Sequence, residues 1–212
     1  IQMNEYKFAK KIFYMGNWVA EEMKKIYPEM ADKFIAVGGG LNQEFINTNK
    51  KIKKKNNIIF IGIDYKRKAG DLVVKAFKKM KEKYKIEAEL YIIGPDINEI
   101  DELSENIHVL GKLKRAEISK YLEMAKIFCM PSRFEAYGLV FPEALSYGVP
   151  CIGIDKYEMK YFIENNKNGL LIKEYNEYEL ADAMYRLLKD EKILIYTEKK
   201  KNEYKKKYSW DL

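Results

Sequence analysis

Short apolar runs alternate with amphipathic segments along most of the chain, and this pattern constrains the fold more than any other feature. The mainly apolar runs are IIFIGI (58–63), AELYIIG (88–94), NIHVLG (106–111), IFCMP (127–131), PCIGI (150–154) and NGLLI (168–172). Segments 70–84, 116–125 and 177–190 have apolar residues at helical spacing. Buried strands separated by such helices are typical of a parallel sheet covered on both faces. The sequence therefore predicts a doubly wound, Rossmann-like α/β domain over residues 57–190.

The N-terminal part predicts a smaller unit. We expect a strand at KIFYMGN (11–17), a helix at residues 18–34 and a strand in IAVGGG (35–40). A lysine-rich connector, residues 49–57, then interrupts the pattern. A charged helix around 191–208 closes the chain. We therefore divide the chain into residues 1–50 and residues 51–212.

Composition and cysteines limit the class of protein. The chain has 212 residues, 47% of them apolar, enough to bury a core without disulfides or metals. No apolar run reaches the roughly 20 residues that a membrane-spanning helix needs, and no segment near Ile1 resembles a signal peptide. Cys129 and Cys151 each lie inside an apolar run, so we expect two buried thiols of a cytoplasmic protein, with no disulfide and no metal site.

Lysines give the chain a net charge of +7 and cluster at residues 49–55 and 198–210. Because Arg suits phosphate and base recognition better than Lys, and these clusters lack Arg, we expect no nucleic-acid partner. A solvated lysine-rich surface is one interpretation. Attraction to anionic lipid or to polyanionic ligands is the other, and attraction to lipid implies peripheral contact with the inner face of the membrane.

The segment MPSRFEAYGLVFPEALSYGVPCIGID (130–155) places two carboxylates between two predicted strands. Pro142 indicates that a helix starts near Val140, since proline is tolerated in a helix's first turn. The backbone N–H groups of Gly138, Leu139 and Val140 are then available at the positive end of that helix, where a diphosphate fits. Glycine at position 138 permits close approach of a ligand.

Each of the two glutamates has two interpretations. Glu143 lies in the first turn of that helix, where it either complements the helix dipole or accepts hydrogen bonds from a ribose diol. Glu135 either caps the turn or contacts a ligand. The residues themselves leave both alternatives open.

The segment PSRFEAYGLVFPEALSYGVPCI resembles the E-x7-E signature of retaining glycosyltransferases with the GT-B architecture, the glycosyl transferases group 1 family. The segment IIFIGIDYKRKAGDLVVKAF resembles the family's Gly-Arg…Lys-Gly loop. Other segments resemble parts of the family's domain in the same order along the chain: ELYIIGP, NIHVLGKLKRAEISKYLEMAKIFCMPS, NKNGLLI and KYSW. The likeness covers residues 57–212. Residues 10–48 resemble the end of the acceptor-side domain and the hinge. The chain thus resembles the C-terminal, donor-binding half of a two-domain enzyme that lacks its N-terminal acceptor domain.

The resemblance implies a role for each matched residue. Glu143 would hold the donor ribose, and residues 138–140 would bind the diphosphate through backbone amides. Glu135 would contact hydroxyls of the transferred sugar. Lys68 and Arg67 would neutralise the leaving diphosphate, so no metal or other cofactor is expected. The substrate would be a nucleotide-diphosphate sugar, and the acceptor a glycan or a lipid-linked molecule.

The chain departs from the family pattern at two positions. Ile63 replaces the usual Arg after the strand glycine, and Ala69 replaces the Gly after the Lys. A non-catalytic sugar-nucleotide binding module is therefore the alternative function, and KRK (66–68) is a solvated turn in that reading. An epimerase of the same architecture is disfavoured by the paired glutamates. His108, the sole histidine, is expected to be a surface or hydrogen-bonded residue.

Overall fold

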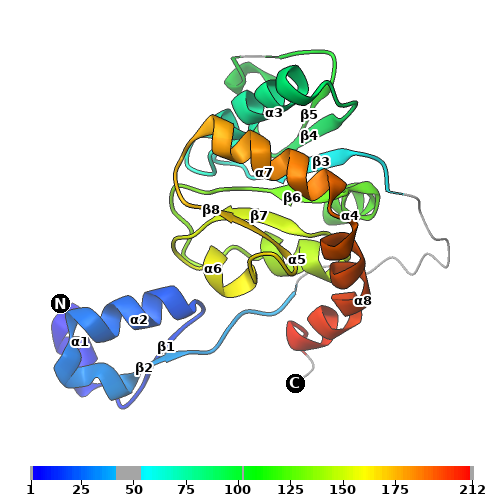
Figure 1. Cartoon of the computed structure of the whole chain (residues 1–212). Helices are drawn as coiled ribbons and strands as arrows, with labels where there is room; N and C mark the ends of the chain where they lie inside the picture. The colour runs from blue at the N-terminus through cyan, green and yellow to red at the C-terminus, as the bar shows by residue number, and fades with distance from the viewer. Residues whose placement is uncertain (1, 42–53, 102, 211–212) are drawn as a thin grey trace.

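The computed structural model describes residues 2–41, 54–101 and 103–210 (Figure 1). The helices and strands in chain order are α1 Gln2–Phe8, β1 Ile12–Tyr14, α2 Asn17–Ile26, the 3-10 helix η1 Pro28–Lys33, β2 Phe34–Ala36, β3 Asn57–Ile61, α3 Gly70–Tyr84, β4 Glu89–Ile93, the 3-10 helix η2 Ile97–Glu99, β5 Ile107–Gly111, α4 Arg115–Met124, β6 Ile127–Cys129, α5 Val140–Ser146, β7 Cys151–Ile154, α6 Met159–Phe162, β8 Gly169–Ile172, α7 Glu177–Lys189 and α8 Glu191–Lys207.

Within the described residues, six strands form the main sheet in the order β5-β4-β3-β6-β7-β8. Every neighbouring pair in it is parallel. The chain moves outward from β3 to β5, returns to the other side of β3 at β6 and continues to β8, which is the doubly wound order. The predicted Rossmann-like parallel sheet is confirmed. The strand order reverses between β3 and β6, and ligands of such sheets bind beyond that point.

The helices cover both faces of this sheet. Because parallel crossovers are right-handed, α3, which leads to β4, and α5, which leads to β7 in the opposite direction, lie on opposite faces. Helix α7 packs beside α3, and α8 packs against α5 (Figure 1). The core between these layers contains the fully buried side chains Phe60, Phe77, Phe128 and Phe141. Both cysteines are buried and free, as expected.

Helix α3 shows why these segments adopt their predicted structure. Its buried residues Leu72, Val73, Ala76, Phe77 and Met80 recur at spacings of three and four, so they share one face. Strand β3 is buried at all five positions, as expected for a central strand covered on both sides. The predicted helix at residues 70–84 is confirmed at both ends.

The N-terminal unit, residues 12–41, contains a separate two-stranded parallel sheet of β1 and β2, with α2 packed against β2. Figure 1 shows this unit beside the main sheet, followed by the segment after β2. The proposed boundary at residue 50 lies outside the described residues, so the two-part division stays a prediction. Helices α1 and α6 were not predicted from the sequence, because each is only one or two turns long.

Candidate functional site

The candidate site lies at the carboxyl edge of the main sheet, beyond β3 and β6. The loop after β3, residues 62–69, and the loop after β6, residues 130–139, are hydrogen-bonded to each other. The backbone N–H of Arg133 donates to the Arg67 carbonyl oxygen at 2.8 Å. The Ser132 hydroxyl oxygen lies 3.2 Å from the same carbonyl oxygen. The switch point of the sheet is therefore occupied by two loops that hold each other in place.

The loops after β4 and β5 lie at the same edge. The Gly62 N–H donates to the Ile93 carbonyl oxygen at 2.9 Å, and the Gly94 N–H donates to the Gly111 carbonyl oxygen at 2.8 Å. A Cβ atom added at Gly94 would lie 2.7 Å from the backbone of Gly62, so these two loops approach more closely than a side chain would allow. The loops after β3, β4, β5 and β6 are thus adjacent in space.

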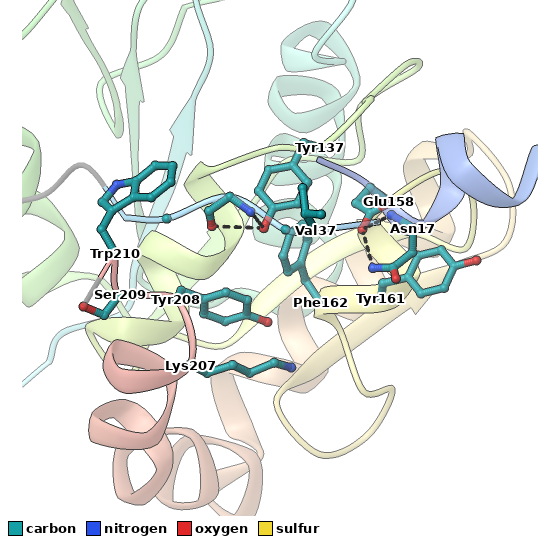
Figure 2. A pocket seen from close by; sticks show the side chains of 13 residues that line it. Asn17, Val37, Tyr137, Glu158, Tyr161, Phe162, Lys207, Tyr208, Ser209 and Trp210 are labelled. Atoms are coloured by element: carbon teal, nitrogen blue, oxygen red, sulfur yellow. Dashed lines mark hydrogen bonds between the residues drawn. The ribbon is translucent and has the colours of Figure 1, made fainter. Parts of the chain in front are cut away.

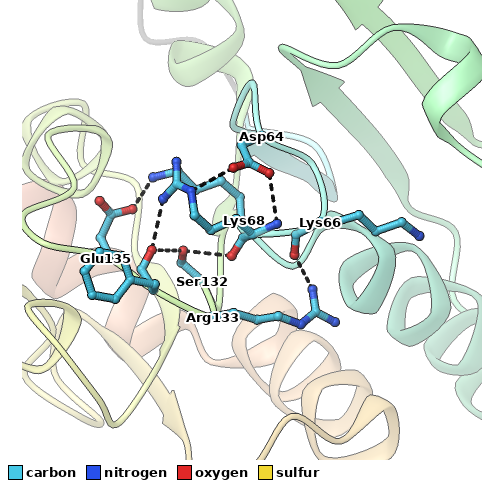
Figure 3. A network of polar contacts seen from close by, with 8 residues as sticks. Asp64, Lys66, Lys68, Ser132, Arg133 and Glu135 are labelled. Carbon is cyan, nitrogen blue, oxygen red and sulfur yellow. Dashed lines mark hydrogen bonds and ion pairs between the residues drawn. The ribbon is translucent and has the colours of Figure 1, made fainter.

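Lys68 and Glu135 form an ion pair across the two central loops (Figure 3). Their side chains are only 14% and 8% exposed, so the pair is largely removed from water. The Lys68 stem lies on Gly62, where an added Cβ would be 2.8 Å from the Lys68 Cγ. Glu135 therefore does not simply cap its turn, the alternative left open by the sequence. Its carboxylate faces a buried cation instead.

Arg67 is placed differently from Lys68. Its Nε donates to Asp64 at 2.9 Å and its Nη1 to the Phe134 carbonyl oxygen at 3.1 Å, with a side chain 41% exposed. The Arg67 backbone N–H also lowers the pKa of the Asp64 carboxyl. The KRK turn is therefore solvated at Arg67 but buried at Lys68. The guanidinium thus bonds to the backbone of Phe134, the residue before Glu135.

Arg133 is a site residue that the sequence analysis did not identify. Its Nη1 and Nη2 donate to the two carboxylate oxygens of Asp71 at 2.7 and 3.0 Å. Its guanidinium also lies 6.0 Å from the centre of the Tyr175 ring. This bidentate pair ties the loop after β6 to the first turn of α3. The only sequence signal was an Arg directly after the Ser of PSRFE.

The segment from Gly138 to Val140 has the geometry that the sequence predicted. Gly138 has φ +86°, and a Cβ there would lie 2.9 Å from the Glu135 Cγ. Helix α5 begins at Val140, and the Phe141 N–H donates back to the Gly138 carbonyl oxygen at 3.0 Å. Among the described residues, no backbone carbonyl accepts from the N–H groups of residues 138–140 outside that helix. Their role in anion binding stays a prediction.

Glu143 is partly buried in the first turn of α5. Burial raises the pKa of its carboxyl to about 7, and the positive charge of Arg115 at the start of α4 opposes that shift only in part. An unligated Glu143 therefore titrates near neutral pH. Perturbed carboxyl groups of this kind are more frequent at functional sites than elsewhere.

The two departures from the family pattern have different structural outcomes. Ile63 is 66% exposed, an apolar side chain in the loop after β3. Ala69 is fully buried and has φ +60°, a left-handed conformation that favours glycine. Ala69 therefore keeps the left-handed backbone that the family's Gly would adopt, at the cost of strain. At position 63, in contrast, an exposed apolar side chain replaces the positive charge of the family's Arg.

The structure also bears on the histidine, on metal ligands and on membrane-spanning helices. His108 Nε2 lies 2.7 Å from a Glu89 carboxylate oxygen and its ring stacks on Tyr91, so the expectation of a hydrogen-bonded histidine is confirmed. In the described ranges, no three His, Cys, Asp or Glu side chains are grouped as metal ligands would be. None of the described helices is long and apolar enough to cross a membrane.

A family model described as glycosyl transferases group 1 matches residues 42–208. An uncharacterized 41.2 kDa protein in the cps region of Klebsiella pneumoniae is 30% identical over 157 residues, which are 73% of this chain and 42% of that protein. The N-acetyl-alpha-D-glucosaminyl L-malate synthase of Bacillus anthracis is 31% identical over 127 residues, 57% of this chain and 33% of the synthase. The chain therefore spans less than half the length of these two relatives.

Solved structures of low sequence identity share the fold. A variant of S. aureus TarM, in complex with fondaparinux, alpha-GlcNAc-glycerol and UDP, superposes with a TM-score of 0.80 at 20% identity. The match covers 99% of this chain and 44% of that one.

Proposed function

The chain belongs to the glycosyl transferases group 1 family, and we propose that it is the donor-binding half of a retaining glycosyltransferase. In this proposal it binds a nucleotide-diphosphate sugar at the carboxyl edge between β3 and β6. The observation that carries the proposal is the buried Lys68–Glu135 pair beside Gly138. A buried cation and carboxylate at a switch point, next to a helix N-terminus, provide groups for both a diphosphate and a sugar.

The roles follow from the charges and donors of each group. Lys68 would neutralise the diphosphate, together with Arg67 at the more exposed side of the loop. The negative charge on the leaving diphosphate grows as the glycosidic bond breaks, so positive charge there stabilises the transition state more than the ground state. Glu135, released from Lys68, would accept hydrogen bonds from the sugar hydroxyls. Protein cations would thus do the work that a metal does elsewhere.

Helix α5 would hold the rest of the nucleotide. The backbone N–H groups of residues 138–140 would donate to the diphosphate, which Gly138 allows to approach closely. The ionised carboxylate of Glu143 would accept from both hydroxyls of the ribose. Arg115, close enough to lower the Glu143 pKa, would favour that ionised form.

The acceptor half would be supplied by a further domain. That domain would hold a glycan or a lipid-linked acceptor, and transfer would retain the anomeric configuration of the sugar. We place this reaction in the cytoplasm, at the inner face of the membrane where the acceptor is a lipid. The lysine-rich surface of α8 supports contact with anionic headgroups.

A non-catalytic sugar-nucleotide binding module is the second candidate, and the exposed Ile63 favours it. Without a guanidinium at this position, less positive charge would face the leaving group. A binding module returns the nucleotide sugar intact on long incubation, whereas a catalytic half releases nucleotide slowly by transfer to water. Ile63→Arg is expected to accelerate release in a catalytic half and to leave a module inert.

Thermal denaturation with UDP, GDP, ADP and their sugar conjugates tests donor binding. A nucleotide at 100 times its dissociation constant adds about 2.7 kcal/mol, which corresponds to a rise in Tm of roughly 5–11 °C for a chain of this size. Glu143→Ala is expected to abolish the rise. Glu105→Ala, an exposed glutamate in the loop before β5, is the matched control and should keep it. Equal rises in both variants would contradict the ribose role of Glu143.

A further inference from the structure

A cavity of about 260 Å³ lies at the junction between the N-terminal unit and the main domain (Figure 2). Its lining comes mainly from the glycine-rich segment after β2, from helix α6 and from the residues that follow α8. The Leu41 N–H donates to the Tyr208 carbonyl oxygen at 2.7 Å, and a Cβ added at Gly40 would clash with the Trp210 ring. The two segments that flank the cavity are therefore fixed to each other.

Aromatic rings form the buried wall of the cavity. The Phe162 ring packs edge to face on Tyr137 and on Tyr208, with centroids 5.2 and 5.8 Å apart, and all three residues are buried. Val37 also lines the cavity and is 59% exposed, so the cavity opens to solvent. An apolar cavity of roughly 150 Å³ admits benzene, so this one has room for a ring with a short side chain.

The hydroxyl of Tyr208 faces this cavity (Figure 2). Tyr208 is only 9% exposed, yet no hydrogen bond joins its hydroxyl to any other residue that the structure describes. Burial raises the pKa of this hydroxyl, so it stays protonated and can donate. Because a buried hydroxyl without a partner is unfavourable, a ligand that accepts from it would be stabilised there.

Lys207 places a positive charge next to that hydroxyl. Its Nζ lies 5.1 Å from the centre of the Tyr208 ring, and Figure 2 shows both polar groups pointing to the same side, below Phe162. Across residues 2–41, 54–101 and 103–210, no carboxylate forms an ion pair with this ammonium group. A hydroxyl and an ammonium group that both donate favour a ligand oxygen with negative charge.

Glu158 also lines the cavity, but its charge is already balanced. It is fully buried, and its carboxylate oxygens accept from the Asn17 N–H at 3.0 Å and the Trp18 N–H at 2.7 Å. The Asn17 side-chain amide donates to it as well, at 3.0 Å (Figure 2). A carboxylate from the main domain thus caps helix α2 of the N-terminal unit, where the positive end of the helix offsets its charge.

We propose that this cavity binds a small carboxylate that carries an aromatic ring. The carboxylate would accept hydrogen bonds from the Tyr208 hydroxyl and the Lys207 ammonium group. The ring would pack against Phe162 and Tyr137, since aromatic rings favour the edge-to-face contacts that this wall offers. A bound molecule would contact the segment after β2 and the residues after α8 together, so it should stabilise the protein without any nucleotide.

This site is separate from the candidate donor site. None of the side chains of Lys68, Glu135 and Glu143 lines the cavity. The Tyr137 hydroxyl is occupied as well, because it accepts from the Gly39 N–H at 2.7 Å and donates to the Gly39 carbonyl oxygen at 3.1 Å. Only the ring of Tyr137 therefore faces a ligand, and the two sites should be occupied independently.

Phenylacetate is the probe for this proposal, and phenylacetamide, which has the same shape without the charge, is the matched control. Saturation-transfer NMR and thermal melts measure binding of each to the whole chain. Phenylacetate is expected to bind and to raise Tm, and the amide to bind at least about tenfold more weakly, the value of one charge-assisted hydrogen bond. No binding of phenylacetate, or equal binding of the amide, would overturn the proposal.

Four variants locate the binding site. Tyr208→Phe removes only a hydroxyl that has no partner among the described residues, so the variant should fold normally, and Lys207→Met removes the charge. Each is expected to weaken phenylacetate binding about tenfold. Lys206→Met and Tyr178→Phe, at exposed positions outside the cavity lining, are the controls and should bind as the unaltered protein does. Unchanged binding in either Tyr208→Phe or Lys207→Met would overturn the assignment of this cavity.

Saturating UDP tests whether the two sites are separate. Phenylacetate is expected to bind equally well with and without UDP, and competition between them would overturn the separation. A protein that binds phenylacetate but not UDP would support the cavity and would count against the proposed function alone.

Discussion

Replacing Glu143 with glutamine is expected to stabilise the protein at alkaline pH and to have little effect at acidic pH. Burial raises the pKa of this carboxyl from 4.5 to about 7, so the folded protein holds a proton there that the unfolded chain releases. The associated stability is fully present below pH 4.5 and is lost as the pH rises through 7. Glutamine resembles the neutral acid and removes this dependence.

The size of the effect follows from the two pKa values. Above pH 7 the folded protein contains an ionised Glu143 that its surroundings disfavour, at a cost of up to about 3 kcal/mol. At pH 5 the cost is about 1 kcal/mol, since most of the penalty has not yet developed. Glu143→Gln should therefore raise Tm by roughly 6–12 °C at pH 8 and by only about 2–4 °C at pH 5.

Circular dichroism melts of both proteins between pH 4.5 and 8.5 provide the measurement. The reasoning requires that the Tm difference grow with pH and level off above 7. A gain that is equal at pH 5 and pH 8 would show that glutamine acts through packing and not through the charge. No gain at pH 8 would mean that Glu143 is not destabilised by burial at all.

Three further predictions follow from the same edge of the sheet. If only ionised Glu143 binds the ribose, UDP affinity should rise about tenfold between pH 6 and pH 8, and calorimetry showing a flat profile would contradict this. Lys68→Met should lower the free energy of unfolding, measured with urea, by about 3–5 kcal/mol because it leaves Glu135 buried without its partner. Arg67→Met removes an exposed pair and should lower it by less than about 1 kcal/mol. Equal losses in the two variants would refute the difference in burial. Ala69→Gly should stabilise the protein by up to about 1 kcal/mol by relieving its φ of +60°, and a loss of stability in the same urea assay would show that no strain is stored there.

The sequence predicted the main sheet because its signals are local. Strands such as NIIFI and helices such as residues 70–84 bury their apolar residues with periods that can be read without knowing their neighbours. The start of α5 near Val140 was also predictable, since Pro142 restricts the backbone around it. The placement of Gly138 just before this helix and of Glu143 in its first turn was inferred from that start. Short elements such as α6 carry too few periods to be recognised.

The contacts across the junction were not predictable in the same way. Glu158 caps a helix 140 residues earlier in the chain, and nothing in the segment around it distinguishes this carboxylate from a surface glutamate. The Arg133–Asp71 pair likewise joins a loop to the first turn of α3, which only the sheet order brings together. The left-handed Tyr157 has no sequence signal of its own, because tyrosine is not a residue expected at positive φ.

The candidate edge of this molecule contains groups held in unfavourable states. Glu143 is buried and titrates near pH 7, while Ala69 and Tyr157 have left-handed backbones that cost roughly 1–2 kcal/mol each. The opposite holds for the core, where the largest apolar side chains are fully buried. A site that must accept a charged ligand keeps groups whose best partner is the ligand itself, so substitutions that stabilise this edge are expected to weaken binding there. The same stability gain obtained in the core should leave binding unchanged, and a measured contrast of this kind would support the proposal that this edge is the binding surface.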